Sequence, residues 1–201
     1  MEAPRVVISP DIYFRIQAMR DSPLLLLPGL NEIYIRHRPP LDLSSALFLA
    51  SRSTLNTVQV HGIQRPERQS LILFLSTLYA KSPGLARLYL SGAINASLNY
   101  VYRFTRLQSL ELSFFDQHVD PQLLQKLGQL GDLLDLRIDT NLGEFVLSHT
   151  NAPSTTYPNF RKLRKLHVVG VSRSINHILT QMKGLANLTI LGIFEIRKPF
   201  A

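Results

Sequence analysis

The chain of 201 residues contains no cysteine and no tryptophan, and charged residues make up only 18% of it. Without cysteine it can form neither a disulfide framework nor a thiolate metal site. No apolar run approaches the roughly 20 residues of a membrane-spanning helix, and the first residues lack the basic and then apolar plan of a secretory signal. Hydrophobic residues make up 45% of the chain, too many for intrinsic disorder. These features predict one folded domain that is intracellular, cytoplasmic or nuclear, and makes no membrane contact.

The sequence also lacks the motifs of the common enzyme classes. It has no glycine-rich phosphate loop, no His-Glu-x-x-His segment and no nucleophile elbow. Its six histidines are scattered without metal-ligand spacing. Asp135 and Asp139 imitate an acid–base pair, but Arg137 between them favours a surface ion-pair cluster. We therefore expect a protein that is not an enzyme, with no catalytic residue, no metal and no cofactor.

What the sequence does contain is a repeat. The pattern apolar-x-x-apolar-x-apolar occurs seven times, with 22 to 30 residues between successive first leucines. Such a pattern at such a period is the signature of the leucine-rich repeat. In each copy the second and third apolar residues have the period of a strand and are expected to face a core. The copies begin at Leu30, Leu55, Leu85, Leu107, Leu133, Leu163 and Leu188.

Between these strands the pattern changes to helical period. In the segment 66–81, Leu71, Phe74, Leu75 and Leu78 fall on one helix face. One strand–helix unit cannot bury its apolar side alone, whereas stacked units share a core. The sequence therefore predicts an α/β leucine-rich repeat solenoid, with a curved parallel sheet on the concave side and helices on the convex side. A single domain of about seven repeats is expected over residues 1–201.

Proline and capping residues place further helices and one loop. Ser9-Pro10 and Asp120-Pro121 each put a capping side chain before a proline at the first helical position. The segment 142–157 contains Asn-Ala-Pro-Ser and is expected to be an extended loop. The remaining expected helices cover residues 43–51, 95–104 and 174–183.

In a leucine-rich arc, the residues between the core positions face outward on the concave side and form the expected binding surface. Tyrosine and arginine are enriched at interface hot spots, which singles out Tyr34, Arg87 and Tyr89. An exposed strand face also collects such residues for solubility and strand propensity alone. The same pattern places Thr57 and Val169 on the outward side. The candidate partner-binding residues are Tyr34, Arg36, Gln59, His61, Arg87, Tyr89, Glu111, Asp135, Arg137, Asp139, Lys165 and His167.

Charge changes sign along the chain. Residues 1–109 hold 12 basic and 6 acidic side chains, residues 110–160 hold 2 and 7, and residues 161–201 hold 8 and 1. A nucleic-acid-binding protein needs one connected basic stripe, whereas banded charge suits selection of a protein partner. Binding of nucleic acid through the basic run 161–165 remains an alternative.

Several segments resemble the repeat region of fungal F-box-type leucine-rich repeat proteins, especially the large basidiomycete set. They are LLPGLNEIYI, SPGLARLYLSG, FTRLQSLELSFFDQHVDPQLLQKLGQLGDLLDLRI and YPNFRKLRKLHVVGV. The resemblance implies a non-catalytic substrate-recognition arc of a cullin–RING ubiquitin ligase, in which F-box helices ahead of the repeats hold the adaptor subunit. No F-box-like segment precedes the first repeat here, because Pro10–Met19 already has the pattern of a repeat helix. The adaptor is therefore a partner only if an F-box lies outside this chain, and a free-standing repeat scaffold unrelated to ubiquitin is the rival interpretation.

The last repeat is apolar at nearly every position between Leu188 and Ile196. An apolar strand at the edge of a sheet offers unpaired backbone groups and favours association. An end repeat also exposes the core that a neighbouring unit would cover. We therefore expect self-association through this C-terminal edge.

Overall fold

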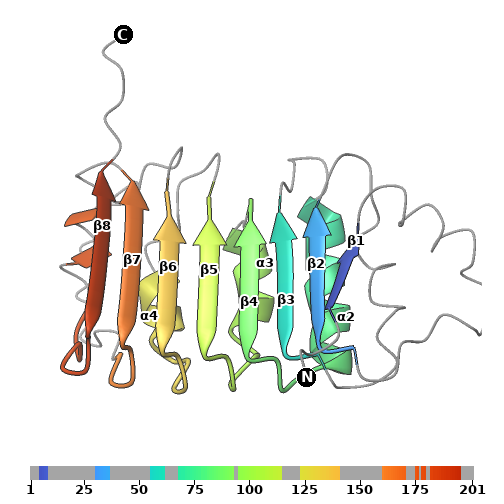
Figure 1. Ribbon diagram of the computed structural model, residues 1–201, viewed down its shortest axis with the longest axis horizontal. Coiled ribbons are helices and arrows are strands. Elements are labelled where there is room, and N and C mark those ends of the chain that lie inside the picture. The colour runs from blue at the N-terminus through green and yellow to red at the C-terminus, as the bar shows by residue number, and fades with distance from the viewer. Residues whose placement is uncertain are drawn as a thin grey trace, which may run out of the picture.

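A computed structural model describes residues 5–8, 30–36, 55–61, 68–92, 95–114, 123–140, 160–170, 175–176, 178–179 and 182–195. Eight strands form one sheet, and their order in the sheet is their order in the sequence. All seven neighbouring pairs are parallel (Figure 1). The strands are β1 (Arg5–Ile8), β2 (Glu32–Arg36), β3 (Thr57–His61), β4 (Arg87–Ser91), β5 (Ser109–Ser113), β6 (Asp135–Asp139), β7 (Lys165–Gly170) and β8 (Ile190–Glu195).

The described helices lie on one face of this sheet. Figure 1 shows α2 (Arg68–Lys81), α3 (Asn95–Val101) and α4 (Leu123–Leu127) behind the strands. Parallel neighbours need a crossover connection, and these helices belong to crossovers on the same side. We call the opposite side of the sheet, where no described helix lies, the open face. The chain is thus an α/β protein in which each strand extends an all-parallel sheet in sequence order.

The predicted strand register is confirmed for β2 to β7. Leu110, for example, lies opposite Leu88 on one side and Leu136 on the other. The inward positions of these six strands are all 2% exposed or less. They are Ile33, Ile35, Val58, Val60, Leu88, Leu90, Leu110, Leu112, Leu136, Ile138, Leu166 and Val168.

The sheet contains one strand more than the repeat pattern predicted. Strand β1 pairs with β2, and Val6 and Ile8 lie opposite Ile33 and Ile35. Three residues before Val6 the sequence has Ala3, where the other copies have leucine. All seven copies recognised in the sequence begin with leucine, and the smaller alanine leaves this strand outside that set.

Helix α2 confirms the helical pattern found in the sequence. Its residues Leu71, Phe74, Leu75 and Leu78 are fully buried against the sheet core. Helix α3 ends at Val101, three residues before the predicted end at Phe104, because the chain turns there to begin the next strand. The Phe104 N–H donates to the Val101 carbonyl over 3.1 Å, a bond across three residues instead of four.

Other expected segments are only partly described. Helix α4 begins at Leu123, shortly after Asp120-Pro121, and residues 175–176 and 178–179 within the expected helix 174–183 are helical. The expected helices at 10–19 and 43–51 and the loop at 142–157 lie outside the described residues.

One turn recurs ahead of the strands and sets their register. The N–H of the first leucine donates to the carbonyl three residues earlier, as from Leu133 to Leu130 over 3.1 Å. The carbonyl of the residue that follows the first leucine then accepts two N–H groups from the next unit. The Gln108 carbonyl, for example, accepts from Leu134 over 2.8 Å and from Asp135 over 3.0 Å. The same two-donor contact occurs at Asn31, Asn56, Ala86, Gln108, Leu134 and Arg164.

Candidate binding surface

The open face collects the side chains that alternate with the core positions. Because the register is constant, these side chains form three rows across the sheet. The first row is Glu32, Thr57, Arg87, Ser109, Asp135, Lys165 and Ile190. The second row is Tyr34, Gln59, Tyr89, Glu111, Arg137, His167 and Gly192. In the third row, Arg36 lies opposite His61, and Ser91, Ser113, Asp139, Val169 and Phe194 follow one another.

The structure brings all twelve sequence-predicted binding residues to strand positions on this face. Arg87, Arg137 and Lys165 are exposed. The side chain of Arg36 is outside the described set, although its backbone is paired opposite His61. The other eight are half-buried, namely Tyr34, Gln59, His61, Tyr89, Glu111, Asp135, Asp139 and His167.

Contacts between neighbouring strands hold the part of this face formed by β2 and β3. The rings of Tyr34 and His61 lie 4.9 Å apart, centroid to centroid, at an angle of 42°. One step along, the Gln59 amide donates to a carboxylate oxygen of Glu32 over 3.3 Å. Both contacts join β2 to β3 and restrain these side chains; restrained side chains lose less conformational entropy when a surface binds a ligand.

The expected ion-pair cluster within β6 is replaced by a pair between two strands. Arg137 lies 3.6 Å from a carboxylate oxygen of Glu111 on β5. The physical reason is spacing. Directly opposed side chains on adjacent strands are about 5 Å apart, whereas Asp135 and Asp139, two residues away along the same strand, are roughly 7 Å from Arg137. The expectation from the sequence considered only neighbours along the chain, so it did not pair Arg137 with Glu111.

Two residues expected to be exposed on the open face are buried. Thr57 is 5% exposed and Val169 is 9% exposed. Thr57 is a short side chain between the longer Glu32 and Arg87 of its row, and Val169 lies beside the larger Phe194. Alternation correctly gives the direction of these side chains, but the neighbouring side chains decide how much of each remains accessible.

The charge bands of the sequence become bands in space because the strands lie in sequence order. On the open face, Arg87 of β4 and Lys165 of β7 flank the acidic side chains of β5 and β6. Glu111, Asp135 and Asp139 outnumber Arg137 there. A partner that matches this face would place basic groups over β5 and β6 and acidic groups beside β4 and β7.

The end of the open face at β8 is apolar. Ile190 and Phe194 complete the first and third rows, and Gly192 completes the second. A Cβ atom at Gly192 would lie 2.5 Å from Nδ1 of His167, so the imidazole occupies the place of a side chain there. The sequence pattern placed these positions outward, but the search for tyrosine, arginine and charged residues left them out of the candidate set.

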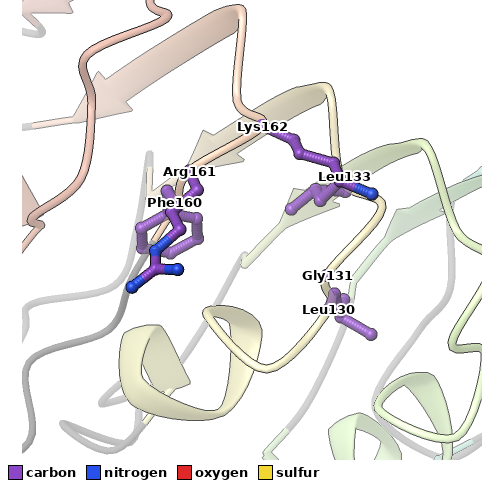
Figure 2. A pocket seen from close by; sticks show the side chains of 6 residues that line it. All are labelled: Leu130, Gly131, Leu133, Phe160, Arg161 and Lys162. Carbon is purple, nitrogen blue, oxygen red and sulfur yellow. The ribbon is translucent and has the colours of Figure 1, made fainter.

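A hollow lies at the end of the sheet where the strands begin, between the turns that precede β6 and β7 (Figure 2). Its volume is about 260 Å³, and its lining is Leu130, Gly131, Leu133, Phe160, Arg161 and Lys162. This volume is below the roughly 300–1,000 Å³ of sites for small organic ligands. The apolar part of its lining lies beside the exposed Arg161.

An ion pair joins the two turns. Lys162 donates to Asp132 with 2.7 Å between nitrogen and oxygen. The basic run expected at 161–165 is therefore divided: Lys162 is already paired, whereas Lys165 lies on the open face opposite Asp135 and Ile190. The run does not form one continuous line of free cations.

In the described part of the chain, no group of three histidine or acidic side chains is arranged to hold a metal ion, and no described helix has the length and apolar character needed to cross a membrane. Comparisons of the chain with protein-family models, with curated proteins and with solved structures find no match.

Proposed function

We propose that the chain is a leucine-rich repeat solenoid that acts as a non-catalytic protein-binding module, with the open face as its binding surface. The observation that carries this proposal is the constant register of β2 to β8, which lines up three rows of polar, aromatic and charged side chains. Extended binding surfaces of this kind are what stacked repeats provide. The recurring turn and the burial of the first leucine in six of the seven copies support the repeat assignment.

The chemistry of the open face favours a protein partner. Protein interfaces are enriched in tyrosine and arginine, and here Tyr34 lies on β2 and Arg87 and Tyr89 lie on β4. Both signs of charge are present at short intervals, which provides specificity through complementarity. A surface spread over several strands suits a partner with an extended complementary face.

The resemblance of the sequence to fungal F-box-type repeat proteins names a more specific role. In that role the open face holds a protein that is to be ubiquitinated, and the adaptor of the ligase binds a separate F-box. The rival is a scaffold that binds its partner without any link to ubiquitin. The two roles differ in what happens to the bound protein, since only a ligase substrate becomes more abundant when the ligase or the proteasome is blocked.

The experiment is affinity capture from an extract of the cells that make the protein, with mass spectrometry of the retained proteins. The wild-type chain is compared with a Tyr34→Ala/Tyr89→Ala variant, which removes two aromatic side chains from the open face. The matched control is Leu73→Lys, at an exposed position of α2 on the other side of the molecule. The proposal expects retained proteins that the double variant loses and the control keeps. Equal retention by all three chains would contradict it.

A further inference from the structure

Strand β8 carries large apolar side chains that are exposed on both of its faces. Ile190 and Phe194 on the open face are 43% and 57% exposed, and Leu191 and Ile193 on the helix side are 50% and 46% exposed. Among the described residues the one other large hydrophobic side chain exposed to this degree is Leu73. A concentration of exposed apolar surface on a single strand marks an interaction site.

One side of the β8 backbone is also available for pairing with another strand. Among the described strands β8 pairs with β7 alone. The N–H of Ile190 donates to the Arg164 carbonyl over 3.0 Å, at the β7 side. Backbone groups of successive strand residues point to opposite sides, so those of Leu191 and Ile193 point away from β7. They can form a ladder with a further strand.

The sequence of this strand is nearly symmetric about its centre. Two apolar residues precede Gly192 and two follow it. In an antiparallel pair of two such strands centred on Gly192, Ile190 lies opposite the partner's Phe194. Leu191 likewise lies opposite the partner's Ile193. A two-fold contact requires one patch that is complementary to itself, and β8 satisfies this requirement. We propose that two copies of the chain pair through β8 in this antiparallel register, and that the dimer covers the exposed apolar side chains.

The register also suits the backbone geometry. Gly192 has the same orientation as Ile190, so its N–H points toward β7, and a pair of Gly192 residues would be of the non-hydrogen-bonded type. Such pairs bring the Cα atoms to about 4.5 Å, the closest approach in an antiparallel ladder. Leu191 and the partner's Ile193 then exchange the hydrogen bonds on either side of the axis.

The basic character of residues 161–201 does not prevent this pairing. In the proposed dimer the Cα atoms of Lys165 and the partner's Lys165 are separated by three strand spacings and four residues along the strand, or about 20 Å. The Debye length at physiological ionic strength is about 8 Å, so their repulsion is screened. Added salt therefore leaves the dimer intact or tightens it, whereas a strand from an acidic partner would bind β8 less well as salt is raised.

The first test is the mass of the full chain in solution. Sedimentation velocity or size exclusion with light scattering at tens of micromolar is expected to give twice the mass of the chain, at low and at high salt. Ile193→Lys is expected to restore the monomer, and Leu73→Lys, which alters the exposed apolar side chain outside β8, is expected to leave the dimer intact. A monomeric wild type, or a dimer that persists in Ile193→Lys, would overturn the proposal.

The second test addresses the register and does not depend on a destabilising change. Because the chain contains no cysteine, Ile190→Cys and Phe194→Cys each introduce a single thiol. In the proposed dimer residue 190 faces the partner's residue 194 at about 4.5 Å between Cα atoms, within disulfide reach. Residue 190 lies about 14 Å from the partner's residue 190. Oxidation of a mixture of the two variants is expected to give a covalent dimer, and oxidation of either alone is not. Equal cross-linking in all three samples, or none in the mixture, would overturn the register.

Discussion

Lys162 and Asp132 form an ion pair that ties the turn before β7 to the turn before β6. The hydrogen bond from Lys162 and its positive charge lower the pKa of the Asp132 carboxyl, the charge of Arg106 lowers it further, and a small desolvation opposes them. A carboxyl whose pKa is lower in the folded than in the unfolded state contributes its full stabilisation at pH values above its ordinary pKa, which is about 4. That contribution is lost as the pH falls through the folded-state pKa.

The first prediction follows from this pair. Lys162→Met is expected to lower the urea midpoint near pH 7 slightly, because both side chains are largely exposed and the pair is screened. The difference from wild type should shrink below about pH 4 and vanish once Asp132 is protonated. Lys165→Met, which removes a similar charge on the open face, is the control. The same difference from wild type at pH 2.5 as at pH 7 would show that Asp132 is not the partner that matters.

A second prediction concerns the core. Leu110 is 1% exposed and lies between Leu88 and Leu136. Leu110→Ala is expected to lower the free energy of unfolding by roughly 2–5 kcal/mol, and Leu136→Ala by a similar amount. Ser113→Ala, an open-face change on the same strand, should stay within about 0.5 kcal/mol of wild type. Urea denaturation measures all three, and an unchanged midpoint in Leu110→Ala would contradict the register of β5.

Association kinetics with the captured protein provide the third prediction. Asp135 is one of the acidic side chains between Arg87 and Lys165 on the open face. Asp135→Lys is expected to slow association with a partner that places basic groups there, and to weaken the salt dependence of the rate. Gln129→Lys adds a positive charge at an exposed turn outside the open face and should leave the rate within about twofold of wild type. If both variants slow association equally, the charge of the open face does not select the partner.

The fourth prediction separates protein binding from nucleic-acid binding. If the basic run 161–165 bound phosphates, affinity for generic DNA or RNA would fall steeply with salt. We expect weak binding that is lost by physiological ionic strength, because Lys162 is paired with Asp132 and the remaining cations are divided between the turn and the open face. Fluorescence anisotropy with labelled oligonucleotides measures this. Tight, sequence-selective binding at 150 mM salt would favour the nucleic-acid alternative.

The strands and their inward positions were predictable because the sequence combines a repeat of 22 to 30 residues with apolar residues at alternate positions inside each copy. Each copy of the repeat has leucine at the turn and apolar residues at alternate strand positions, so Leu107, Leu110 and Leu112 determine direction and register together. Helix α2 was predictable for the same reason, since its apolar residues share one helix face. Strand β1 was missed because Ala3 takes the place of the leucine.

The contacts on the open face were less predictable. The sequence shows which side chains point outward, but it does not show which residue lies opposite which until the lengths of the crossovers are known. Arg137 was therefore expected to form ion pairs with Asp135 and Asp139, whereas its ion pair is with Glu111 on the neighbouring strand. The burial of Thr57 likewise depends on the long side chains that flank it across two strand pairs.

Photo-cross-linking from two matched positions tests the open face as a protein-binding surface most directly. A photoreactive phenylalanine analogue replaces Tyr89 at the centre of the open face in one sample and Leu73 on the exposed side of α2 in the other. After irradiation with the captured protein, the account predicts a covalent complex from position 89 and none from position 73. A complex from position 73 alone would place the binding surface on the helices and contradict the account.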